Sequence, residues 1–244
     1  MRVARLIQGS ACAAALALLV PAATGLAQGP NDDRVVAGGC IFVQGWKGRI
    51  AVSDTSSIRQ GRKIEDSKFS SIPGGMRVES GPAAIYWNPA NVATAPFTLK
   101  ATFTEAKFQE FNDHPHSYGL FIGGNKLDTD QMSVAYCVVY GDGKALVRGI
   151  NPTAPRMAFT LMRDTTENAA VHKAADKLQP VTNEITWHVT ADRADCSVNG
   201  KPVAGYTKAE MVGAGKLESF DGIVGIRTTH NVDFTVTNWS LTKG

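Results

Sequence analysis

The chain has 244 residues, of which 43% are hydrophobic and 19% are charged, and its formal net charge at neutral pH is +3. The lysines and arginines are scattered along the chain rather than clustered. The sequence therefore predicts neither a basic stripe that would follow nucleic acid nor a polybasic patch for a membrane surface. Soluble partners and small ligands remain as the expected classes.

The first residues have the pattern of a cleavable secretory signal. Basic residues precede an apolar stretch at 11–20, and a run of small residues ends at Ala27. A membrane helix anchored at its start is the alternative, but the apolar stretch is too short to span a bilayer. We expect residues 1–27, with Cys12, to be removed, leaving 23 basic residues against 22 acidic ones. The expected location is secreted or periplasmic, with no integral membrane segment after cleavage.

The rest of the chain, about 215 residues, suits one large β-sandwich. Residues 28–40 are polar and rich in glycine, which is typical of a linker, so the domain is expected at 41–244. Three cysteines remain, Cys40, Cys137 and Cys196, and an odd number permits one disulfide and one leftover thiol. Pairing of Cys137 with Cys196 and burial of free thiols both fit the sequence.

Short apolar and β-branched runs, separated by Gly, Pro, Asn and Asp, predict an all-β domain. The clearest strands are expected at residues 97–104, 117–123, 133–140, 145–150, 157–162, 184–191, 195–199, 223–228 and 232–241. Gly141-Asp142-Gly143 and Asn199-Gly200 provide the turn residues of two tight hairpins.

Two segments interrupt this simple pattern. In the last strand the apolar residues change phase after Val236, which predicts a β-bulge near Thr237-Asn238. The segment 167–178 is rich in alanine and is followed by Pro180, so it predicts either one short helix or a loop with one helical turn.

The order of several motifs resembles a known superfamily. The motifs are Gln44-Gly45-Trp46-Lys47-Gly48, the strand 96–103, the element 118–121, the segment 183–203 with its Asn-Gly turn, and the closing strands 221–227 and 232–241. In this order, over residues 41–243, they are similar to the concanavalin A-like lectins and glucanases, and most to the 3-keto-disaccharide hydrolase family. The resemblance implies a two-sheet antiparallel jelly-roll sandwich with at most one short helix, whose concave sheet commonly holds a sugar.

Three functions follow as expectations. The first is an exported protein that binds a glycan, or another small ligand, on its concave sheet. The second, implied by the resemblance, is a glycoside hydrolase of the 3-keto-disaccharide hydrolase type. The third is a non-catalytic module for protein interaction or structure. The resemblance transfers no mechanism, because the E-x-D-x-x-E strand motif of the glucanases does not occur in this sequence.

The hydrolase reading requires an acid and a base. Glycoside hydrolysis uses paired carboxyl groups, and Glu105 and Asp113 flank a stretch in which aromatic and charged residues alternate. His116 is a further candidate for acid or base. The simpler interpretation is that these residues belong to a solvated strand end and loop.

The glycan-binding reading requires aromatic and polar side chains on an open face. Trp87 precedes Asn88-Pro89, which reads as a turn, so Trp87 is expected as an exposed platform with Tyr86 beside it. Tyr118 lies in the next expected strand. Arg148, opposite Tyr136 through Tyr140 in a hairpin, is expected to donate hydrogen bonds to sugar hydroxyls.

Two segments carry possible metal ligands. His114 and His116 are one residue apart, so in an extended segment their imidazoles point to opposite faces, and joint ligation would need a turn at Pro115. We expect a polar loop without metal there. Asp128-Thr129-Asp130 has the alternating oxygens of a calcium loop but lacks its later Gly and Glu. The sequence thus predicts no cofactor, with calcium as the alternative.

Overall fold

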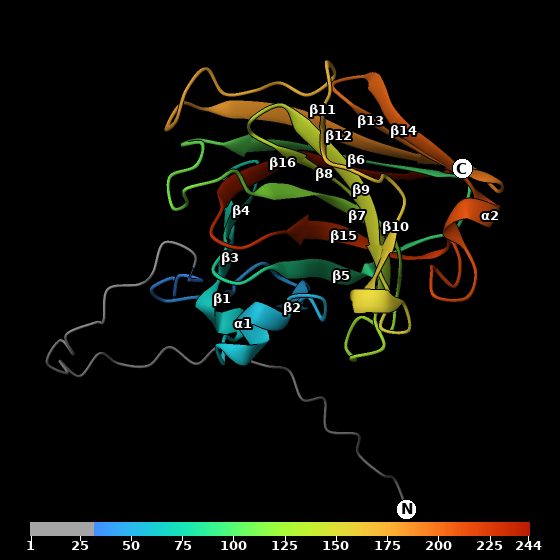
Figure 1. Ribbon diagram of the computed structural model, residues 1–244, viewed down its shortest axis with the longest axis horizontal. Coiled ribbons are helices and arrows are strands. Elements are labelled where there is room, and N and C mark those ends of the chain that lie inside the picture. Colours follow the sequence, from blue (N-terminus) through green and yellow to red (C-terminus); the bar gives the residue numbers. More distant parts are fainter. Residues whose placement is uncertain (1–31) are drawn as a thin grey trace, which may run out of the picture.

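The structure is a computed structural model, and it describes residues 32–244. The expected signal peptide, 1–27, lies outside the described residues. Two large sheets make up the fold (Figure 1). Sheet A has the strand order β1 (Cys40–Ile41), β3 (Lys68–Ile72), β4 (Gly75–Glu79), β16 (Asp233–Lys243), β6 (Phe97–Glu105), β12 (Val181–Val189), β13 (Arg193–Val198) and β14 (Lys201–Thr207).

Sheet B has the order β10 (Ala158–Thr160), β9 (Lys144–Ile150), β8 (Ser133–Tyr140), β7 (Ser117–Asn125), β15 (Gly222–Thr228), β5 (Ala84–Ala93) and β2 (Lys47–Ile50), with β11 (Thr166–Glu167) paired to β9. In Figure 1, β8, β7, β15, β5 and β2 follow one another down the picture. The strand pairs are antiparallel, apart from the parallel pair of β1 with β3. The expected all-β jelly-roll sandwich is confirmed.

The helices are few and short. They are α1 (Thr55–Arg59) and α2 (Lys208–Met211), with 3₁₀ turns η1 (Ile64–Asp66) and η2 (Pro155–Met157). The sequence predicts at most one short helix, and the segment 167–178, expected as one short helix or as a loop with one helical turn, is a loop. Its alanines lie in a loop where Ala170 and Ala174 are buried, and the Asn168 side chain accepts a hydrogen bond from Ala170 N–H. Packing of these alanines at the edge of the sandwich replaces their helical preference.

The alternation of buried and accessible residues along β6 defines the core. Its residues at odd positions, from Phe97 to Glu105, face sheet B, and those at even positions are partly accessible. On sheet B the disulfide between Cys137 in β8 and Cys196 in β13 joins the two sheets, with Cα atoms 6.5 Å apart. Cys137 therefore points toward sheet A, and its neighbours Tyr136 and Val138 point to the outer face of sheet B.

Local sequence signals place the turns correctly. Asn199 and Gly200 both have positive φ in the β13–β14 hairpin, and Gly143 has positive φ between β8 and β9. The predicted bulge is confirmed, since the register of β16 on β6 shifts between Thr237 and Ser240.

The interpretation of Asn88-Pro89 as a turn is wrong. Both residues lie within β5, where pairing with β15 shifts: Trp87 is opposite Gly225 and Val92 is opposite Ile223. More residues of β5 than of β15 lie between these two pairs, so the polar residues bulge out while the strand continues.

Part of the expected linker, 28–40, packs against the sandwich. Asp33 is buried, and Arg34 donates to the carbonyl oxygen of Ser80 at 2.8 Å and, through its backbone N–H, to the Asn231 side chain at 2.7 Å. These contacts tie the segment to the residue that follows β4 in sheet A and to the loop between β15 and β16. Among the described residues, none of the helices is long and apolar enough to cross a membrane.

Candidate ligand-binding face and histidine cluster

The outer face of sheet B carries an unusual row of side chains. Strand register places Arg148 opposite Tyr136, and Tyr136 opposite Phe121. Phe121 is in turn opposite Gly225, which is opposite Trp87. The row therefore crosses five strands, from β9 through β8, β7 and β15 to β5, with arginine at one end and tryptophan at the other.

Two arginines flank Tyr136 on this face. The guanidinium carbon of Arg227 lies 5.6 Å from the centre of the Tyr136 ring. Within the described residues, the Nε atoms of Arg148 and Arg227 are buried and have no hydrogen-bond partner. Burial raises the pKa of Tyr136, and the two arginines oppose that rise. Arg227 also donates from Nη1 to the carbonyl oxygens of Ala84 and Thr228, so in the part of the chain that the structure describes the two Nε–H groups are the donors without a partner. Free N–H donors of cationic groups beside an aromatic ring form a surface suited to a ligand rich in hydroxyl groups.

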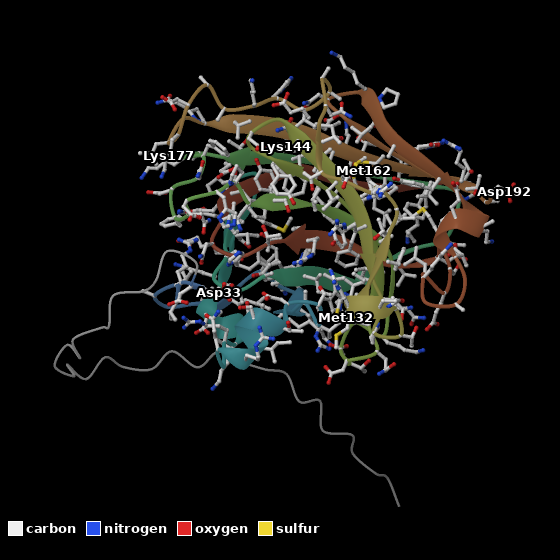
Figure 2. All side chains as sticks on the ribbon, viewed as in Figure 1. Asp33, Met132, Lys144, Met162, Lys177 and Asp192 are labelled. Carbon is white, nitrogen blue, oxygen red and sulfur yellow. A yellow bond between two sulfur atoms is a disulfide. The ribbon has the colours of Figure 1, made fainter. Side chains whose placement is uncertain are left out.

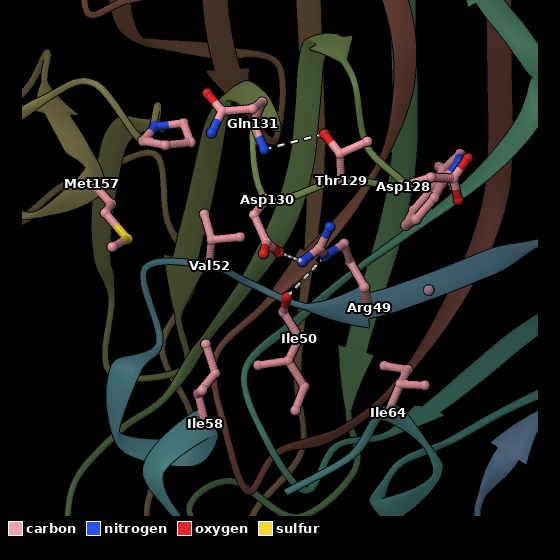
Figure 3. A pocket seen from close by; sticks show the side chains of 13 residues that line it. Arg49, Ile50, Val52, Ile58, Ile64, Asp128, Thr129, Asp130, Gln131 and Met157 are labelled. Atoms are coloured by element: carbon pink, nitrogen blue, oxygen red, sulfur yellow. Dashed lines mark hydrogen bonds and ion pairs between the residues drawn. The ribbon is translucent and has the colours of Figure 1, made fainter. Parts of the chain in front are cut away.

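A pocket of about 930 Å³ opens at the tryptophan end of the row (Figure 3). Its walls are largely apolar, from Ile50, Val52, Ile58, Ile64, Trp87, Pro152 and Met157. At its rim Arg49 donates to Asp130 at 2.7 Å, and Lys47 donates to Asp128 at 3.0 Å. The volume lies in the range of ligand sites, and apolar walls with a few oriented polar groups are their usual composition.

These ion pairs bear on the calcium alternative. The Asp128 and Asp130 carboxylates, offered by the sequence as calcium ligands, each face a basic side chain of β2. Both aspartates line the pocket, and each is paired there with a cationic side chain.

The expectation that Trp87 is an exposed platform is wrong. The side chain is only 1% exposed, because β5 continues past it and a second apolar cluster, with Val52 and Phe121, packs around it. Trp87 therefore lines the pocket as part of its packed wall. Tyr86 and Tyr118 are also fully buried, on the inner face of sheet B, so the structure places them in the core rather than on the ligand face. Arg148 alone of the four predicted ligand residues lies partly accessible on the outer face.

The three predicted catalytic residues lie in two places. Glu105 is buried at the end of β6, and burial raises its pKa to about 7; the hydrogen bond from Gln109 N–H and the nearby Tyr118 hydroxyl oppose the rise. Asp113 is exposed and belongs with His116 in another cluster. The structure thus groups Asp113 with His116 and places Glu105 in the core at the end of β6.

Three histidines converge at the end of β7 and β15. The ring centres of His116 and His114 are 4.5 Å apart, and those of His116 and His230 are 4.2 Å apart. The expectation that His114 and His116 point to opposite faces is wrong, because the chain bends at 113–114 before β7 begins. His230 joins them because Thr229 N–H donates to the Ser117 carbonyl oxygen, which aligns the two loops.

Two of these imidazoles form hydrogen bonds with carboxylates. The Nδ1 of His230 lies 2.6 Å from Asp33 Oδ1, and the Nδ1 of His114 lies 2.5 Å from Asp113 Oδ1. Burial alone would raise the pKa of Asp33, but hydrogen bonds from His230 and Ser57 outweigh it and lower that pKa. Asp33 lies beside α1, the helix that contains Ser57 (Figure 2). The hydrogen bond from His114 lowers the pKa of Asp113.

His116 is the buried member of the cluster. Burial lowers its pKa to about 3, and the neighbouring His230 and His114 add to this effect. Its Nε2 atom is buried and has no hydrogen-bond partner among the described residues. Asp113 and His116 are close in the sequence, which already suggests a common site. His230 is more than a hundred residues away in the sequence, and only strand pairing places it beside them.

Comparison with solved structures finds several proteins of similar fold. A carbohydrate-binding module, CBM66, from Bacillus subtilis aligns with a TM-score of 0.51 and 11% identity over 84% of this chain and 99% of that one. A Bacillus subtilis protein of unknown function with a galectin-like fold has a TM-score of 0.54 and 9% identity, over 82% and 90% of the two chains. The laminarinase catalytic domain of Thermotoga maritima has a TM-score of 0.52 and 10% identity, over 87% and 99%.

These likenesses show the fold. The chain is a two-sheet jelly-roll β-sandwich, and its fold is similar to those of a carbohydrate-binding module, a protein with a galectin-like fold and a laminarinase catalytic domain. No family model and no curated protein matches the sequence, so membership of the 3-keto-disaccharide hydrolase family is not shown.

Proposed function

We propose that this protein is exported and binds a glycan on the outer face of sheet B. The observation that carries the proposal is the pair of buried, unpartnered arginine Nε atoms on either side of Tyr136. A buried cationic donor without a partner is costly, and hydroxyl oxygens of a sugar would satisfy it. The adjoining pocket, floored by Trp87, provides room for further sugar units. Similarity of fold to a carbohydrate-binding module supports the same assignment.

Export has its own support. The disulfide between Cys137 and Cys196 is of the kind that persists in oxidising compartments such as the periplasm or the cell exterior. Together with the signal-like pattern of residues 1–27, it favours a protein that acts outside the cytoplasm.

Binding is favoured over hydrolysis of the 3-keto-disaccharide type. Hydrolysis by the usual route places two carboxyl groups on opposite sides of one glycosidic bond. Here Glu105 lies at the inner end of β6, and Asp113 lies in the exposed loop with the histidines. The predicted carboxyl pair thus consists of one buried and one exposed group, whereas Arg148 and Tyr136 lie opposite each other on one face of sheet B.

A binding experiment with matched variants tests the proposal. The secreted protein is screened against a panel of oligosaccharides, and the affinity of each hit is measured by calorimetry for the parent, Arg148→Met and Arg193→Met. Loss of a charged donor should weaken binding about 10-fold or more, so Arg148→Met should bind worse. Arg193→Met removes an exposed arginine of β13, on the other sheet, and should bind as the parent does.

Three results would contradict the proposal. They are no saturable binding to any sugar, equal binding by the parent and Arg148→Met, or equal loss in both variants. Turnover of aryl glycosides or 3-keto-glycosides by the parent would instead establish the hydrolase alternative.

A further inference from the structure

The histidine cluster has the composition of a metal site. His114, His116 and His230 each offer a ring nitrogen, and these three nitrogens all lie within 4.8 Å of one another. We propose that they form a binding site for a divalent transition-metal ion, and that zinc is the ion that the site accepts. The site is separate from the ligand face, and it does not depend on the identity of any glycan.

The distances are close to those of a bound site. Zinc lies about 2.0–2.1 Å from imidazole nitrogens, so three nitrogens around one tetrahedral ion are roughly 3.3 Å apart. The cluster is therefore slightly open and needs to contract on binding. His114 can make most of this movement, because its side chain is 55% exposed and lies in a loop.

The carboxylates fix which nitrogen of each ring is available. In metal sites a ligating histidine usually donates its second ring N–H to a carboxylate, which sets the tautomer and the orientation of the ring. Asp33 and Asp113 accept from the Nδ1 atoms of His230 and His114. The Nε2 lone pairs of both rings are then left for a metal ion.

His116 provides an independent observation. Its side chain is buried, at 6% exposure, and its Nε2 is enclosed without a hydrogen-bond partner. A buried polar atom is normally satisfied by protein or water. An ion bound between the three rings would supply the missing partner, so the orphaned nitrogen and the convergence of the rings have the same explanation.

The choice of metal follows from the ligands. Imidazole suits zinc, copper, nickel and iron, whereas calcium and magnesium prefer oxygen ligands. Three histidines around zinc leave a fourth position for water or another small ligand, as in catalytic zinc sites. Because Asp33 belongs to the N-terminal segment and the histidines flank β7 and β15, metal binding would also hold that segment against sheet B.

A metal-binding assay with matched histidine variants tests the site. The secreted protein is purified without a polyhistidine tag, stripped with a chelator, and titrated with Zn²⁺ while bound metal is measured by atomic spectroscopy. The parent should bind about one equivalent per chain. His114→Gln, His116→Gln and His230→Gln should each lose stoichiometric binding. His188→Gln, which removes an exposed imidazole from β12 on sheet A, should keep it.

Two further measurements identify the ligands. Cobalt in place of zinc should give the intense visible absorption of a tetrahedral ion in the parent and in His188→Gln only. Asp113→Asn should weaken zinc binding about 10-fold, since partners behind the ligands typically contribute 10- to 100-fold. If His116→Gln does not fold, the result for His114→Gln decides whether the site exists, because His114 is exposed and its replacement should leave the fold intact. The site is refuted if the parent binds no zinc, if the cluster variants retain it, or if His188→Gln loses it equally.

Discussion

Glu105 places a carboxyl group at an inward-facing position of β6, where the other inward-facing residues are apolar. Glu105 continues the inward phase of Phe97, Leu99, Ala101 and Phe103 in β6, and it is only 4% exposed. The Gln109 N–H donates to it at 3.0 Å, and this hydrogen bond only partly offsets the cost of burying the charge. At the scale of single residues, position in the strand therefore decides protonation.

The raised pKa of Glu105 predicts how stability changes with pH. The folded state holds the proton up to about pH 7, whereas the ordinary value is 4.5. The folded protein therefore binds more protons than the unfolded chain between these values, and stability falls as pH rises from about 4.5 to 7. The shift corresponds to a loss of up to about 3 kcal/mol. In Glu105→Gln, which keeps the acceptor for Gln109 N–H, this fall should disappear.

Urea unfolding at several pH values between 4 and 8 measures this effect. Glu184→Gln, which removes a more accessible carboxyl group from β12, is the matched control and should keep the pH profile of the parent. A Glu105→Gln profile that also follows the parent would show that Glu105 is not the group responsible.

The phase of β6 is a signal that the sequence contains. Alternation from Phe97 onward places Glu105 inside the sandwich if the strand is extended by one residue, which would have separated it from the exposed Asp113. No comparable local signal joins His230 to His114 and His116. Their meeting depends on the pairing of β7 with β15, which is set by the whole sheet.

At the scale of elements, β5 determines what Trp87 does. The strand pairs with β15 on one side and β2 on the other, so Trp87 lies opposite both Gly225 and Lys47. A Cβ atom at Gly225 would meet the ring of Phe121, so the glycine leaves room for that ring, which belongs to the same apolar cluster as Trp87. Asn-Pro usually indicates a turn. Here pairing with two partner strands keeps β5 extended through these residues.

Burial of Trp87 predicts a large cost for its removal. Trp87→Ala should lower the free energy of unfolding by about 3–5 kcal/mol, from lost transfer energy and the cavity left behind. Val92→Ala on the same strand is the control, because Val92 is 47% exposed and its truncation should change stability by less than about 0.5 kcal/mol. Chemical denaturation monitored by circular dichroism measures both. A Trp87→Ala protein as stable as Val92→Ala would mean that the indole is not packed as described.

At the scale of the whole molecule, the order of the motifs along the sequence is sufficient to predict the two-sheet architecture. The strands after residue 96 can be predicted from the alternation of apolar and polar residues and from the turn residues between them. The first strands are less visible: β1, β3 and β4 are short and lie at one end of sheet A. They pair with one another in that order, and β4 joins them to β16, at the far end of the chain. Such long-range pairing leaves little trace in a local sequence pattern, so the position of the N-terminal segment beside His230 could not be predicted.

The disulfide joins β8 of one sheet to β13 of the other, and its removal tests how much the cross-link contributes to the whole fold. Cys137 and Cys196 are 59 residues apart in the sequence. Closing a loop of that length in the unfolded chain stabilises the folded state by about 4 kcal/mol on the chain-entropy account. The Cys137→Ser, Cys196→Ser double variant should therefore lose roughly that amount of its free energy of unfolding, measured with urea under oxidising conditions.

Reducing conditions provide the control. The stability of the parent should then fall to nearly that of the double variant, since both lack the cross-link. A double variant within about 1 kcal/mol of the oxidised parent, well below the typical 2–4 kcal/mol, would contradict a bond between the sheets, and core packing alone would then hold them together.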